Sequence, residues 1–173
     1  MAPKGLKATS SPIQIGEFVA ETAANTFNSS TIDLTLNVLD NEVFVVTQLN
    51  LDVEAPDSVT GVTTQTSASL STTARTTVGS IADQNVLGQA RRTIVTNAAM
   101  TADGGIPFDR EDPLFAAISE DYLGIVATNN MFLNIQGLNN GNPKGVSCRV
   151  YGYRAKADAA TYAALVQSEL LSQ

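Results

Sequence analysis

Histidine and tryptophan are absent from this chain of 173 residues, and Cys148 is its only cysteine. Without histidine the chain cannot form a Ser-His-Asp triad, a Cys-His dyad or a histidine zinc site. A single cysteine excludes a disulfide framework within the chain and a four-cysteine metal site. No other catalytic motif is present, so we expect a protein that is not an enzyme and that carries no cofactor.

Positive charge is also scarce, with 10 Lys and Arg against 17 Asp and Glu and a net charge of −7. Between residues 8 and 74 the chain has eight acidic residues and no basic one. Proteins that bind nucleic acid need Lys and Arg to neutralise phosphates, so we expect no direct nucleic-acid binding. Charged residues make up only 16% of the chain. Sparse surface charge suits a subunit whose faces are covered by neighbours, because desolvating a charge is costly.

Long hydrophobic runs are missing as well. No window approaches the ~18 apolar residues of a membrane span, and no apolar run follows the lysines of MAPKGLKATSSP, so we expect neither a transmembrane segment nor a signal peptide. Residues 1–11 are small and polar, which predicts a flexible N-terminal arm. Its lysines, Lys4 and Lys7, are candidates for contact with the acidic stretch of a neighbouring copy.

What the sequence does contain is the composition of a β protein, because Thr, Ser and Asn together supply 45 of its residues. TIDLTLNVLD, from Thr31 to Asp40, alternates apolar and polar residues and predicts a strand. A longer strand is predicted from Val43 to Glu54. Period two places Val43, Val45, Leu49, Leu51 and Val53 on one face, with Phe44 and Val46 on the polar face. Further strands are expected within 58–80, at 90–97 and in a hairpin around Asn129-Asn130.

Residues 100–113 have the composition of a loop and hold the best candidates for site chemistry. Three carboxylates lie within four residues, and oxygen ligands of this kind suit Ca²⁺; the candidate ligands are Asp109, Glu111 and Asp112. A hydrolase would need two carboxylates facing each other across a cleft. Asp103, Asp109 and Glu120 are available, but their spacing does not pair them.

The segment from Val146 to Arg154 predicts the last strand. Val146, Cys148 and Val150 share one face, which makes Cys148 a buried small hydrophobe. The other face carries Arg149, Tyr151 and Tyr153, residue types that are enriched at protein interfaces and that are also found in sugar-binding sites. The period then changes. Asp158 is a good N-cap, and an amphipathic helix is expected over 158–173, with contact candidates Tyr162, Leu165 and Leu170.

Eight or nine strands and one terminal helix indicate an all-β chain, folded as an antiparallel sandwich of two sheets. Eight strands favour a single jelly roll over 12–157, and an immunoglobulin-like sandwich is the alternative. This layout of polar arm, long strand runs, Asn/Gly/Thr-rich loops and terminal helix resembles the small single jelly-roll capsid proteins of tailless icosahedral viruses.

The resemblance implies a viral structural protein of the virion, a capsid subunit that self-assembles into an icosahedral shell with copies of itself and a second capsid protein. Many capsid proteins that touch their genome have a basic arm, which this chain lacks. Its inner face is therefore expected to meet an internal membrane, without inserting into it, or another protein layer or cations, and not bare nucleic acid. Two other functions stay open, namely a carbohydrate-binding module using Tyr151 and Tyr153, and a subunit of a tube, filament or phage tail.

Overall fold

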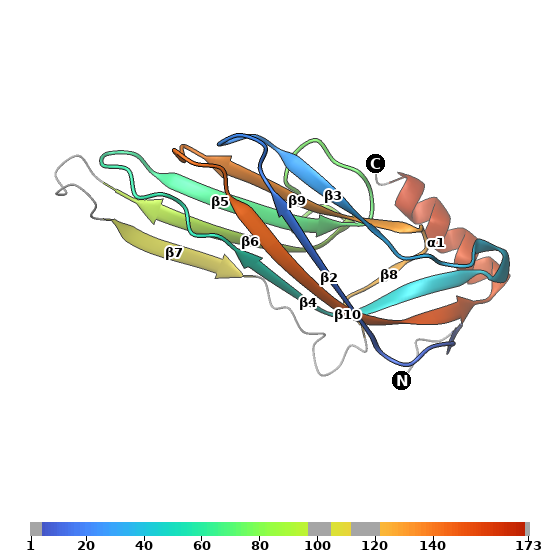
Figure 1. The fold of residues 1–173 in the computed structure, drawn as a ribbon. Coiled ribbons are helices and arrows are strands. Elements are labelled where there is room, and N and C mark those ends of the chain that lie inside the picture. The colour runs from blue at the N-terminus through green and yellow to red at the C-terminus, as the bar shows by residue number, and fades with distance from the viewer. Residues whose placement is uncertain (1–4, 97–104, 112–121, 172–173) are drawn as a thin grey trace.

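A computed structural model describes residues 5–96, 105–111 and 122–171, which form two antiparallel β-sheets and one helix (Figure 1). Sheet A contains β1 (Leu6–Ala8), β2 (Ile13–Ala20), β4 (Glu42–Val53), β8 (Gly124–Val126) and β10 (Gly145–Ala157). Sheet B contains β3 (Asn28–Asp33), β5 (Thr64–Ser71), β6 (Val86–Val95), β7 (Ile106–Glu111) and β9 (Asn130–Leu138). A 3-10 turn, η1 (Val38–Asp40), precedes β4, and α1 (Ala159–Leu171) follows β10.

The strand pairing is nested, as in a long hairpin rolled up on itself. β2 pairs with β10, β3 with β9, β4 with β8, and β5 with β6. Contacts of β10 with β4 and of β9 with β5 join these pairs into the two sheets. This is the winding of an eight-stranded jelly roll, so the predicted all-β jelly-roll sandwich is confirmed. Two strands are added to it, β1 beside β10 and β7 beside β6.

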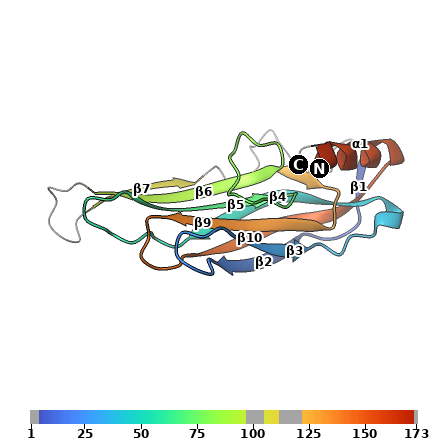
Figure 2. The ribbon, with the colours of Figure 1, turned by 90° about the horizontal axis from the view of Figure 1, so that it is seen from above.

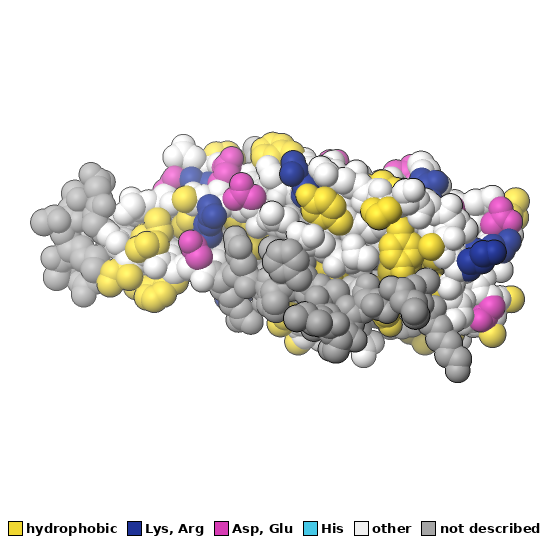
Figure 3. Space-filling model, turned by 90° about the horizontal axis from the view of Figure 1, so that it is seen from below, with side chains coloured by type: hydrophobic (Ala, Val, Ile, Leu, Met, Phe, Trp, Pro, Cys, Tyr) yellow, Lys and Arg dark blue, Asp and Glu magenta, His cyan; other side chains and the backbone are white. Residues whose placement is uncertain are grey.

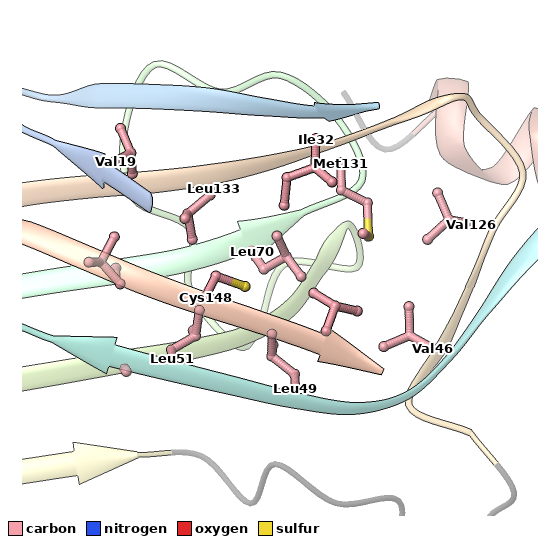
Figure 4. Packing of buried hydrophobic residues seen from close by; sticks show 14 of the residues in the cluster. Val19, Ile32, Val46, Leu49, Leu51, Leu70, Val126, Met131, Leu133 and Cys148 are labelled. Atoms are coloured by element: carbon pink, nitrogen blue, oxygen red, sulfur yellow. The ribbon is translucent and has the colours of Figure 1, made fainter. Parts of the chain in front are cut away.

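The main core fills the space between the sheets (Figure 4). Its residues come from both layers, with Leu49 and Leu51 on β4, Leu70 on β5, and Met131 and Leu133 on β9, all fully buried. Cys148 lies in the same core with 5% of its surface exposed, which confirms the predicted role as a small hydrophobe. Burial raises the pKa of its thiol to about 12, so the side chain is neutral and inert in the folded protein.

A bulge in β4 corrects the predicted face assignment of that strand. Opposite β10, Gln48 pairs with Tyr151 and Val46 with Gly152, which leaves Thr47 unpaired. One extra residue reverses the alternation of side chains. Phe44 and Val46 therefore join Leu49, Leu51 and Val53 in the main core, whereas Val43 and Val45 point to the outer side of sheet A.

The helix α1 covers this outward-facing patch of sheet A. Tyr162, Leu165 and Val166 pack on a second cluster formed by Val43, Val45, Ala127, Ala155 and Ala157. The expected helix cap is confirmed, since Asp158 Oδ1 accepts a hydrogen bond from the Thr161 amide at 2.8 Å. At the other end of α1, the carboxylate of Glu169 accepts hydrogen bonds from the amides of Ala127 and Thr128 at 2.9 and 3.1 Å.

Two predicted strand features are wrong. The strand expected over 31–40 ends at Asp33, because Thr35 adopts a positive φ of 49° and the Leu36 amide bonds the Asn129 side chain instead of a neighbouring strand. The hairpin expected around Asn129-Asn130 does not form, since β8 pairs in sheet A and β9 in sheet B.

Two segments that were expected to be irregular contain strands. Residues 106–111 form β7, in which Ile106 and Phe108 alternate with Pro107 and Asp109; an edge strand tolerates proline. Within the expected flexible arm 1–11, residues 6–8 form β1 on the chain's own β10, where Leu6 lies opposite Ala157 and packs against the second cluster.

Candidate assembly surfaces

The outer face of sheet A beyond α1 is a broad polar surface. Arg149 lies opposite Asn50, and Tyr151 lies between Gln48 and Gln14. Arg149 is exposed and Tyr151 is half-buried. Phe18, on the neighbouring strand, exposes 58% of its surface and is the large apolar side chain of this face.

The interface candidates at the C-terminal end divide into two groups. Tyr153, Tyr162 and Leu165 are half-buried in the cluster beneath α1, so the apolar stripe of the helix is used within the chain itself. Lys7 is exposed on β1. Lys4 and the side chain of Leu170 lie outside the described part of the chain.

An apolar groove runs along the flank of α1, where Tyr162 and Val166, which pack on the sandwich, border more exposed side chains. Tyr162, Ala163, Val166, Gln167 and Leu171 line a shallow groove of about 550 Å³, and Leu171 exposes 78% of its surface. Glu169, the one acidic or basic residue of α1, is buried against the sandwich, and none of the described residues that line the groove is charged. On η1, at the same end of the molecule, Leu39 exposes 96% of its surface (Figures 1 and 2).

The edge of sheet B carries another apolar patch. Ile106 and Phe108 on β7 expose 51% and 57% of their surfaces, and Val95 lies directly opposite Ile106. Within the described residues, β7 pairs only with β6, which leaves its outer backbone edge open. Figures 1 and 2 place this strand toward the end of the sandwich opposite α1, and Figure 3 shows hydrophobic side chains gathered there. Sequence reasoning missed this patch because its residues were assigned to a loop, although the alternation of Ile106 and Phe108 is visible in the sequence.

The acidic candidates for Ca²⁺ or hydrolytic chemistry are only partly described. Asp109 is exposed, and its Oδ1 atom lies 3.7 Å from Arg92 Nε in a loose ion pair. Asp103, Asp112, Glu120 and the side chain of Glu111 lie outside the described part of the chain. Among the residues that are described, no three Asp, Glu or Cys side chains gather as a metal site would require. The Ca²⁺ site therefore stays a prediction.

Among solved structures, the comparison includes a weak match, whereas the searches by sequence found none. No protein-family model and no curated protein sequence matches the chain. A solved structure titled Desmodium yellow mottle tymovirus matches at 8% sequence identity and a TM-score of 0.30, covering 91% of this chain and 86% of that one. A TM-score of this size establishes neither a shared fold nor a shared function. Over the described residues, no helix has both the length and the apolar character needed to cross a membrane.

Proposed function

We propose that the protein is a structural subunit of a virion, a capsid protein whose copies assemble into a closed icosahedral shell. The jelly-roll winding is compatible with this role, because viral capsid domains, lectins and cupins use it. The observation that carries the proposal is the presence of two different uncharged apolar patches on one sandwich. We name them the helix patch (Tyr162, Val166 and Leu171) and the edge patch (Val95, Ile106 and Phe108).

Exposed apolar patches on a folded protein mark contact surfaces, because water is released when they are covered. Neither patch includes an ionised side chain, so covering it desolvates little charge. The edge patch adds the open backbone edge of β7. An apolar edge strand is a template for pairing with another chain, and natural proteins normally protect such an edge with lysine, proline or a covering segment.

The positions of the two patches favour contacts of the head-to-tail kind. A contact between unlike surfaces is heterologous, and copies joined in this way form a ring when the rotation closes and a filament when it does not. A shell needs closure, whereas a tube or phage tail does not. We propose the closed shell, with a second capsid protein as an additional partner and an internal membrane facing its inner side.

A matched pair of substitutions tests the edge patch. Ile106→Lys places a charge on β7, and Ile81→Lys makes the same change in the 72–85 loop, where Ile81 exposes 54% of its surface against 51% for Ile106. Particle size is measured by analytical ultracentrifugation and negative-stain electron microscopy across protein concentrations. Thermal unfolding of each variant shows whether the subunit still folds.

We expect the wild type and Ile81→Lys to form particles of one size, and Ile106→Lys to remain a folded small species. A wild-type protein that stays monomeric at high concentration, with and without Ca²⁺, contradicts the proposal. If both variants assemble as the wild type does, the edge patch is not an assembly contact. Open helical tubes in the micrographs would favour the filament over the shell.

A further inference from the structure

A polar cleft lies on the outer face of sheet B, and none of its described lining residues belongs to the helix patch or the edge patch. It has a volume of about 310 Å³ and is lined by side chains of β5, β6 and β9 and by the loop between β5 and β6. Ser67, in the middle strand, is opposite Arg91 on one side and Gln136 on the other. The short side chain of Ser67 lies between the two long ones, which leaves a depression in the surface of the sheet at this position.

The neighbouring rows complete the walls. Gln65 pairs with Leu138 on β9, and Gln89 pairs with Ser69, one row away from Ser67. The Gly79 amide donates a hydrogen bond to Ser69 Oγ at 2.9 Å, which holds the loop over the sheet and brings Thr77 and Val78 to the cleft. The shape of the cleft is therefore set by the strand register and by the loop that Gly79 holds on Ser69.

The chemistry of the lining is that of a polar ligand site. Three glutamines line it, and each amide both donates and accepts hydrogen bonds; they are Gln65, Gln89 and Gln136. Leu138, with 50% of its surface exposed, and Val78 supply apolar contact. None of the lining residues that the structure describes carries a carboxylate, so Arg91 gives this part of the cleft a positive charge in a chain whose net charge is −7.

The guanidinium of Arg91 has no ion-pair partner among the described residues of the chain. Arg75 and Arg92 pair with carboxylates, and Arg154 donates to the Leu34 carbonyl oxygen and the Thr35 hydroxyl. Within the described residues, Arg91 has no such acceptor, and its Nε atom is buried without a hydrogen-bond partner.

We propose that this cleft binds an acidic sugar, with its carboxylate on the Arg91 guanidinium and its hydroxyl groups on the glutamine amides. The planar fork of arginine matches a carboxylate in two parallel hydrogen bonds. Amides suit hydroxyl groups, and Leu138 suits the apolar face of a sugar ring. The described lining of the site shares no residue with the two assembly patches, so sugar binding can be tested on assembled and unassembled protein alike.

The experiment titrates the wild-type protein with methyl glucuronide, methyl glucoside and acetate, and follows binding by saturation-transfer NMR, which also works on large particles. The decisive variant is Arg91→Gln. Its control is Lys156→Gln, which removes a positive charge from an exposed side chain of β10 in sheet A. Gln136→Glu is a second variant, which offers Arg91 a carboxylate across Ser67 and does not shorten any side chain.

We expect glucuronide to bind more tightly than glucoside and acetate. Arg91→Gln is expected to lower its affinity about tenfold or more, since hydrogen bonds to charged groups contribute about 1.5–3 kcal/mol. Gln136→Glu should have a similar effect, whereas Lys156→Gln should leave the affinity unchanged. The proposal is overturned if the wild type binds glucoside or acetate as tightly as it binds glucuronide. It is also overturned if Arg91→Gln binds glucuronide as tightly as the wild type does. An absence of sugar binding also overturns it, and if Arg91→Gln then blocks assembly, the cleft is a contact for a neighbouring subunit's carboxylate.

Discussion

The attachment of α1 to the sandwich by Glu169 gives a quantitative prediction for the substitution Glu169→Ala. The side chain is 8% exposed, and its two carboxylate oxygens accept the amides of Ala127 and Thr128. Ala127 is 3% exposed, so its amide loses its acceptor in the variant and has little access to water. Thr128 is half-buried, and its amide is easier for water to reach.

The magnitude follows from these two amides. A buried donor left without a partner costs about 1–3 kcal/mol. Removing a buried carboxylate offsets part of this loss, because desolvation penalises the charged form. We therefore expect Glu169→Ala to lower the free energy of unfolding at neutral pH by about 1–2 kcal/mol, which is the lower part of the range for an unpartnered donor. For a chain of this length, that corresponds to a fall in melting temperature of about 2–8 °C.

The effect should depend on pH in a defined direction. Burial raises the pKa of the Glu169 carboxyl above its ordinary value of 4.5, although the two amides act in the opposite direction. Between the ordinary and the raised pKa, the folded protein holds more protons than the unfolded chain. This contribution to stability is complete below pH 4.5 and is lost as the pH rises through the raised pKa. The difference between wild type and Glu169→Ala is therefore larger in acid than at neutral pH.

The assay is urea unfolding at several pH values, combined with amide hydrogen exchange at Ala127 and Thr128. Gln167→Ala is the control, because it shortens an exposed side chain of the same helix and should change stability by less than about 0.5 kcal/mol. Equal stability of Glu169→Ala and wild type would refute the reasoning. A loss of stability with unchanged exchange at both amides, or a difference that grows toward alkaline pH, would also refute it.

Two further predictions concern sheet A. At Gly152, beside the β4 bulge, a Cβ atom would lie within 3 Å of the Val45 carbonyl oxygen and the Phe44 ring, so Gly152→Ala should cost about 1–3 kcal/mol in urea unfolding. Gly16→Ala is its control, because a Cβ atom there meets its nearest neighbour at an ordinary 3.9 Å, and equal losses in both variants would contradict the clash. Cys148 should resist thiol reagents at pH 8 until the protein unfolds, since its pKa of about 12 leaves roughly one thiolate in ten thousand; rapid labelling of the native protein would show that the thiol is accessible.

Sequence patterns predicted those features that depend on neighbours along the chain. The alternation around Cys148 correctly indicated its strand and its buried face, and Asp158 correctly indicated the start of the helix. The jelly-roll sandwich followed from the number of such segments and from the absence of helices between them.

Features that depend on distant partners were missed. The unpaired Thr47 is set by the pairing of β4 with β10, and nothing in the local sequence announces it. The left-handed Thr35 ends β3 while the buried Leu34 and Leu36 continue the strand pattern beyond it. Ile106 and Phe108 have the alternation of a strand, but alternation alone does not tell whether the apolar face meets a core or solvent.

The position of β10 has a consequence for biosynthesis. This strand pairs with β1, β2 and β4, all of which precede it in the chain. During translation those segments leave the ribosome before β10, the strand with which they pair. Sheet A can therefore form only after residues 145–157 have left the ribosome. A prematurely terminated chain lacks the middle of that sheet, so the sandwich can form only when the synthesis of residues 145–157 is complete.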